Sequence, residues 1–126
     1  MEMRSDLGRV RGLGSSKEGA AHWWAQRITG VALVPLCLWF VFSAVLLVGA
    51  DLVAFKTWLG THGNALLMVL FIIALFHHAQ LGVHEVIEDY VHGEKAKVAS
   101  LVIVKFIAVV FAASCVLAIL RVSFGG

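Results

Sequence analysis

Three long apolar runs are the feature that most restricts how this chain can fold. Residues 28–48 carry no charge, residues 65–76 form a shorter apolar run that continues into a polar but helix-compatible stretch, and residues 98–120 form the third run. A bilayer core of ~30 Å needs about 20 mostly apolar residues per helix. The 126 residues are 60% apolar and 14% charged. We therefore predict an all-α membrane protein with three transmembrane helices, at about residues 23–49, 63–91 and 97–121.

The segment before the first span, residues 1–21, combines glycine, serine and charge, and predicts an extended arm. It has none of the features of a secretory signal. Residues 22–126 then form the three-helix domain. Trp23 and Trp24 stand where an aromatic belt residue is expected, before the first run. Pro35 lies inside that run and predicts one helix with a bend. Residues 49–63 are predicted to be a loop, with Trp58 as its interfacial anchor.

The basic residues predict the orientation, because lysine and arginine accumulate in loops that stay cytoplasmic. One predicted side carries Arg4, Arg9, Arg11, Lys17, Arg27, Lys95, Lys97 and, by snorkelling of its side chain, Lys105, whereas the other carries only Lys56 and Arg121. We therefore expect a cytoplasmic N-terminus and an external C-terminus.

Several classes of function are disfavoured. A net charge of +2, dispersed along the chain, does not indicate a nucleic-acid surface. Cys37 and Cys115 lie in apolar runs and are expected to be buried thiols, and no C-x-x-C-H motif is present to attach a c-type haem. The chain also has no dinucleotide-binding fingerprint and no cysteine cluster for an iron–sulfur centre.

A stripe of ionisable residues runs along the second span. At ~100° per residue, positions three, four and seven apart share a helix face. One such line consists of His78, Gly82, Glu85 and Asp89, and a weaker neighbouring line of His77, His84 and Val91. Ionisable groups inside a span normally face the protein interior and mark an ion, proton or cofactor site. The second half of this span is therefore predicted to face protein and not lipid.

Haem is the cofactor that best explains His78, since an imidazole nitrogen is a suitable axial ligand for its iron. Gly82, one turn on, would give the macrocycle clearance beside the helix, at a helix-propensity cost of about 1 kcal/mol. The competing interpretation is that His78 only forms a hydrogen bond to a neighbouring helix. The histidines outside this stripe, His22, His62 and His92, are all expected at the membrane interface. Three helices are also too few to surround a porphyrin. A partner membrane subunit is therefore expected to supply the second ligand.

Three more polar residues are candidate site residues. Arg27, where the first span begins, could face haem propionates or a lipid phosphate. Tyr90 lies twelve residues after His78, which corresponds to about 18 Å along a helix, near the headgroups. It could be a belt residue or could donate a hydrogen bond to a quinone carbonyl. Asp89 lies beside it at the cytoplasmic end of the span.

Two motifs resemble a known family. HHAQLGVHEVIEDYVHG, residues 77–93, resembles the H-x3-G-x6-D-Y stretch of the small hydrophobic membrane anchor of succinate dehydrogenase, respiratory complex II, of the proteobacterial and mitochondrial type. HWWAQRITGVALVPL, residues 22–36, is similar to the H-W-x3-R stretch that begins the first helix of the same subunit. Three helices with the N-terminus inside complete the resemblance.

The resemblance implies specific roles. His78 would be an axial ligand of haem b, Arg27 would lie near the haem propionates, Tyr90 would form a hydrogen bond to ubiquinone, and Asp89 would contribute to its proton supply. The implied partners are a flavoprotein subunit, an iron–sulfur subunit and a second membrane anchor subunit. The chain would lie in the bacterial inner membrane with the soluble subunits on the cytoplasmic face, and it would not itself oxidise succinate.

Two other readings remain open. A non-redox scaffold or a small proton-conducting subunit would use His84, Glu85, Glu88 and Asp89 as a proton relay. The anchor of a fumarate reductase would carry the same kind of haem site. His77, His84 and Glu85 have no role assigned from the sequence.

Overall fold

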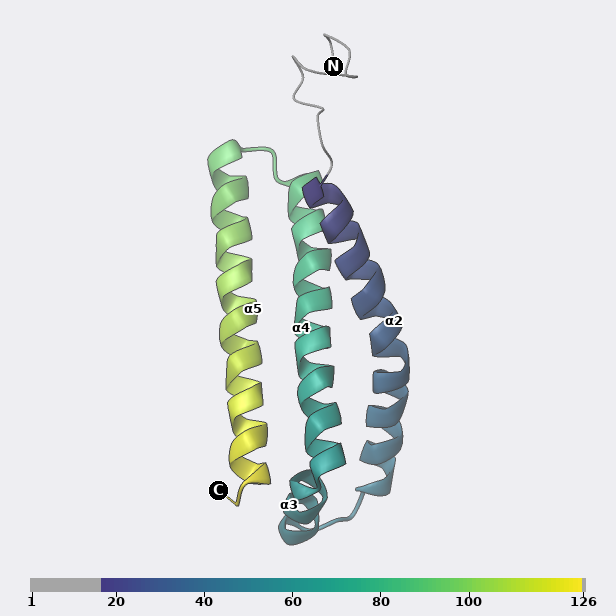
Figure 1. Ribbon diagram of the computed structural model, residues 1–126. Coiled ribbons are helices and arrows are strands. Elements are labelled where there is room, and N and C mark those ends of the chain that lie inside the picture. The colour runs from purple at the N-terminus through teal and green to yellow at the C-terminus, as the bar shows by residue number, and fades with distance from the viewer. Residues whose placement is uncertain (1–16, 126) are drawn as a thin grey trace.

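The computed structural model describes residues 17–125, and this part of the chain is entirely helical (Figure 1). Its elements are α2 (Lys17–Leu46), α3 (Leu52–Gly60), α4 (His62–Tyr90) and α5 (Glu94–Ser123). Most of the predicted arm, with Arg4, Arg9 and Arg11, lies outside the described residues. Residues 17–21 do not belong to an extended arm, because they form the first turns of α2. The run KEGAA, residues 17–21, contains four good helix formers, one lysine, one glutamate and two alanines, which accounts for the earlier start of α2.

Three of these helices are long and apolar enough to cross a membrane: Ala20–Leu46, His62–Tyr90 and Glu94–Ser123. At ~1.5 Å per residue each exceeds the ~30 Å hydrocarbon core. The prediction of three transmembrane helices is therefore confirmed. Pro35 lies inside α2, which continues through it as one helix and changes direction along its length in Figure 1.

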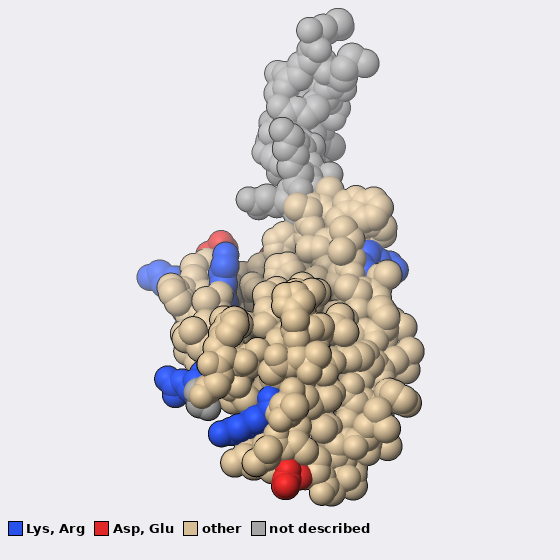
Figure 2. Space-filling model, turned by 60° about the horizontal axis from the view of Figure 1, so that its bottom comes forward, with Lys and Arg blue, Asp and Glu red and all other residues tan. Residues whose placement is uncertain are grey.

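The three long helices lie side by side in a row, with α4 in the centre (Figure 1). Among the described residues, α4 packs against both α2 and α5, whereas α2 and α5 do not contact each other. The buried apolar residues are correspondingly few: Leu33, Leu59, Ala65, Phe71, Leu81, Ile87 and Ile119. Most of the face in Figure 2 is uncharged, and large apolar side chains cover the outer surfaces of all three helices. Such surfaces suit contact with lipid or with other membrane helices.

A short helix, α3, occupies most of the region that the sequence predicted to be a loop. Asp51 caps its N-terminus by accepting a hydrogen bond of 2.8 Å from the Ala54 amide. The Asn64 side chain donates to the Trp58 carbonyl at 2.9 Å, and the Trp58 ring stacks on Trp39 at 5.8 Å between centroids. The loop prediction is thus wrong for Leu52–Gly60, because a local cap and cross-helix contacts stabilise a segment too short to show a clear helical pattern.

The chain ends and connections group the basic residues as the sequence predicted. The beginning of α2 and the α4–α5 connection lie at one end of the row, and α3 and the end of α5 lie at the other (Figure 1). Lys95 and Lys97, at the start of α5, therefore share an end with the beginning of α2. Lys56 of α3 and Arg121 in the last turn of α5 lie at the opposite end. Which end faces the cytoplasm stays a prediction.

Candidate functional site

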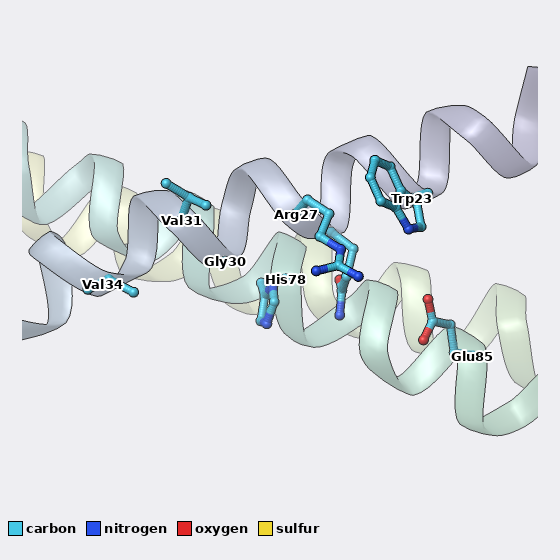
Figure 3. A pocket seen from close by; sticks show the side chains of 8 residues that line it. Trp23, Arg27, Gly30, Val31, Val34, His78 and Glu85 are labelled. Carbon is cyan, nitrogen blue, oxygen red and sulfur yellow. The ribbon is translucent and has the colours of Figure 1, made fainter.

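A cavity of about 580 Å³ lies between α2 and α4, on the polar side of the central helix. This volume falls within the range of roughly 300–1,000 Å³ typical of small-molecule and cofactor sites. Figure 3 shows its lining, which comes from these two helices alone: Trp23, Gln26, Arg27, Gly30, Val31, Val34, His78 and Glu85. The predicted site residues His78 and Arg27 therefore line one cavity.

His78 is held against α2 by a hydrogen bond between side chains. Its Nδ1 lies 3.0 Å from the Oγ1 of Thr29. The next residue, Gly30, also lies against the ring, since a Cβ added there would be 3.4 Å from Cε1 of the imidazole. The ring therefore packs against two small residues of α2, and its Nδ1 is the nitrogen that faces α2. The prediction that His78 forms a hydrogen bond to a neighbouring helix describes a real contact, which uses only one of the two ring nitrogens.

The stripe on α4 follows the predicted periodicity near the cavity. His78 and Glu85, seven residues apart, line the same cavity, and Figure 3 shows Glu85 and Arg27 on the α4 and α2 sides of it. Gly82 lies on the side of α4 that faces α2, where an added Cβ would be 3.8 Å from the Gln26 Nε2. Gly82 is not among the lining residues, and its role in haem clearance stays a prediction. The glycine that lies beside the imidazole is Gly30.

The adjacent histidines of α4 face different neighbours. His77, together with Gln80, lines a smaller groove of about 160 Å³ against Ala108 and Ala112 of α5. His78 instead faces Thr29 of α2. His77 is therefore directed away from the cavity, which makes it a suitable control for any role of His78.

Arg27 brings a positive charge to the cavity. Its guanidinium carbon lies 5.0 Å from the centroid of the Trp23 ring, within the range of a cation–π contact. The side chain is exposed, so that it can reach an anion at the edge of the cavity. This placement fits either the propionate role or the lipid-phosphate role predicted for it. Gln26, on the same helix, has a buried Oε1 with no hydrogen-bond partner among the described residues.

A second cluster lies further along α4. The His84 ring stacks on His22 of α2, with centroids 4.9 Å apart and planes inclined by 29°. The His84 Nε2 also lies 3.2 Å from Oε1 of Glu88. His84 and Glu88 are thus paired with each other, whereas Glu85 lines the cavity beside His78. The four residues proposed as a proton relay therefore lie in three places: His84 and Glu88 are paired, Glu85 lines the cavity, and Asp89 lies at the end of α4.

Asp89 and Tyr90 are the last two residues of α4, and both are exposed. Tyr90 is 75% exposed, and neither residue lines the cavity beside His78. The structure therefore places them apart from His78, as the sequence spacing predicted. Their predicted contact with a quinone would require walls from other chains.

Two residues of the site were missed from the sequence, Thr29 and Gly30. Both follow Arg27 closely in the first span, and small residues are enriched where membrane helices approach each other. That signal predicts a close helix contact. It does not identify the partner, which depends on how α2 and α4 are aligned.

Comparison with known proteins gives a consistent family. The family model described as "Succinate dehydrogenase/Fumarate reductase transmembrane subunit" matches residues 1–118. A succinate dehydrogenase hydrophobic membrane anchor subunit of Paracoccus denitrificans is 33% identical over 116 residues, covering 92% of this chain and 89% of the relative. A succinate dehydrogenase membrane anchor subunit of Reclinomonas americana is 30% identical over 98 residues, covering 75% and 81% of the two chains.

A more distant relative matches nearly the full length. The hydrophobic membrane anchor subunit of succinate dehydrogenase from Rickettsia conorii is 26% identical over 119 residues, which cover 94% of each chain. No solved structure gives a significant match. The three apolar helices and these relatives fit a multi-pass protein of the bacterial inner membrane.

Proposed function

Because the chain belongs to the family of succinate dehydrogenase and fumarate reductase transmembrane subunits, we propose that it anchors a succinate dehydrogenase and supplies one axial ligand, His78, to a haem b. The observation that carries the proposal is the cavity between α2 and α4, with an imidazole in its wall. The curated relatives named above are all succinate dehydrogenase subunits, which favours this enzyme over a fumarate reductase.

The residues around the cavity fit a haem. The Nδ1 of His78 is occupied by Thr29, and Nε2 forms no hydrogen bond among the described residues, so one nitrogen remains for an iron. Apolar side chains of Val31 and Val34 line the wall next to it, and Arg27 lies in the N-terminal half of α2, on the same cavity. A flat apolar group with anionic substituents would meet suitable chemistry at both places. Bound there, haem b would supply one-electron redox chemistry.

The site needs a second protein to be complete. Among residues 17–125, every residue that lines the cavity comes from α2 or α4, and the row of helices does not close around it. A buried macrocycle would require further walls and a second axial ligand. We assign both to a second membrane anchor subunit, which would pack on the α2–α4 face.

We further propose that Tyr90 donates a hydrogen bond to ubiquinone and that Asp89 contributes to its proton supply. Both residues are exposed at the end of α4, where a neighbouring subunit could complete a pocket. Soluble flavoprotein and iron–sulfur subunits at this end of the membrane domain would deliver electrons from succinate. This chain would supply one haem ligand and help to hold the quinone in position.

The ligand assignment is tested by spectroscopy of the purified membrane complex. His78→Ala should abolish or strongly reduce the reduced-minus-oxidised absorbance of b-type haem, because it removes the ligand nitrogen. His77→Ala is the matched control and should leave the spectrum intact, since His77 faces the groove against α5. Unchanged absorbance in His78→Ala would contradict the assignment. A colourless wild-type complex without soluble partners would favour the scaffold or proton-conducting alternative.

A further inference from the structure

We propose that Thr29 is the residue that positions His78 for iron, because its Oγ1 accepts a hydrogen bond from the Nδ1–H of the imidazole and so fixes the tautomer. The inference rests on the proposed haem function and adds to it a residue of α2. Its geometric basis is the 3.0 Å contact between Thr29 Oγ1 and His78 Nδ1. A neutral imidazole has one N–H, and the nitrogen without it is the one that can bind a metal.

The direction of this hydrogen bond follows from counting protons. The Thr29 hydroxyl has a single proton, and two backbone carbonyls lie within reach of it: Ala25 O at 2.7 Å and Gln26 O at 3.1 Å. Carbonyl oxygens can only accept, so in the proposed arrangement the hydroxyl donates to the nearer of them, the Ala25 carbonyl. The hydroxyl lone pairs then remain for His78, and the proton between Oγ1 and Nδ1 belongs to the imidazole. Nε2 is consequently the nitrogen with the lone pair.

This arrangement fixes the orientation of the ring as well as its protonation. The hydroxyl itself is held by the helix backbone, so that it forms a rigid acceptor and not a rotating one. Gly30 allows the ring to pack closely beside it, with Cε1 at ordinary contact distance from an added Cβ. The imidazole is therefore held in place from the α2 side before any ligand binds. Partners of this kind typically affect metal affinity by about 10- to 100-fold.

The hydrogen bond should also influence the haem potential. Donation from Nδ1–H to an oxygen makes the imidazole a more basic ligand, which favours ferric over ferrous iron. Loss of the acceptor should therefore raise the midpoint potential. Thr29 is a positioning residue in this proposal, because it acts through His78 and is not placed against the iron.

The test uses the whole purified complex and two readouts other than turnover: the midpoint potential of the b-type haem and the rate of haem transfer to excess apomyoglobin. Thr29→Val keeps the shape of the side chain but removes the acceptor, and should raise the potential and speed haem loss by about 10- to 100-fold. Thr29→Ser retains the hydroxyl and should restore both values toward wild type. Thr57→Val is the matched control, since the Thr57 hydroxyl donates to the Val53 carbonyl at 2.9 Å in α3 and forms no hydrogen bond to a histidine among the described residues.

The outcomes separate this inference from the proposed function. If His78→Ala loses the haem but Thr29→Val has wild-type potential and retention, Thr29 has no positioning role and the ligand assignment stands. If His78→Ala keeps the haem, the ligand assignment itself fails. Should Thr29→Val fail to assemble, Thr29→Cys retains a weak acceptor of similar size. Its haem loss should then be faster than that of Thr29→Ser, and equal rates would overturn the inference.

Discussion

Two small residues of α2, Thr29 and Gly30, lie against His78. Thr29 occupies one ring nitrogen, and Gly30 leaves room for the ring to lie against α2. A larger side chain at position 30 would begin 3.4 Å from Cε1 of the imidazole and extend into the cavity. The space next to the imidazole therefore depends on the absence of a large side chain at position 30.

Gly30→Leu should consequently reduce haem binding without removing any ligand. Overpacking costs about 1–3 kcal/mol, which corresponds to roughly 5- to 150-fold in affinity. Haem content per complex, measured as the pyridine haemochrome, should fall accordingly. Gly63→Leu is the matched control, because Gly63 is also helical and an added Cβ there meets nothing within 4 Å. Equal haem content in both variants would show that the cavity beside Gly30 is not the haem site.

The sequence predicts one half of this contact and not the other. His78 and Glu85 could be placed on one face of a helix because the period of 3.6 residues fixes which residues of α4 share a side. Thr29 and Gly30 could not be matched to His78, because that pairing depends on the relative shift of two helices joined by a distant connection. Thr29 also reads as an ordinary residue of an apolar span until its partner is known.

At the scale of the helix, α4 links two sites that differ in chemistry. His78 faces α2 beside the cavity, whereas Tyr90 is the exposed last residue of the helix. The twelve residues between them correspond to about 18 Å. A helix of this length can hold a ligand within the membrane and a polar side chain near its surface without either contacting the other.

The two ends of this segment should therefore be separable by mutation. Tyr90→Phe removes one hydrogen-bond donor, worth about 0.5–1.5 kcal/mol, and should lower succinate–ubiquinone activity by roughly two- to tenfold. The b-type spectrum and succinate oxidation with an artificial acceptor should not change. His78→Ala should instead lose the b-type absorbance. A loss of artificial-acceptor activity in Tyr90→Phe would indicate faulty assembly and not a quinone contact.

The helices differ in how well the sequence reveals them. The spans α2, α4 and α5 were predictable because each has enough apolar residues to cross a bilayer. The nine residues of α3 were not, since a single N-cap from Asp51 and the stacking of Trp58 on Trp39 stabilise it. The cap is local, but the stacking contact becomes visible only when α2 and α3 are placed together.

For the molecule as a whole, the row of three helices leaves α2 and α5 with one packed side each. Only α4 lies between two neighbours, and large apolar residues remain exposed on every long helix. A cavity lined from two helices of such a row can be closed only by another membrane chain. The composition predicted insertion into a membrane, whereas the face proposed for a partner follows only from the position of the cavity.

The orientation of this row decides where soluble subunits can bind. The charge asymmetry predicts that the end with Lys95 is cytoplasmic and the end with Lys56 is external. Both side chains are exposed, so single cysteines at these positions can report the topology. Cys37 and Cys115 lie within spanning helices and would first be replaced by alanine.

In intact spheroplasts, a membrane-impermeant maleimide should label Lys56→Cys and leave Lys95→Cys unlabelled. After solubilisation in SDS both should react, which shows that each introduced cysteine is intact and reactive. Normal succinate–ubiquinone activity would show that each variant still assembles. Labelling of Lys95→Cys alone in spheroplasts would reverse the topology. Asp89 and Tyr90 lie at the same end of the row as Lys95. A quinone bound beside them would then be on the wrong side of the membrane to receive electrons from cytoplasmic subunits.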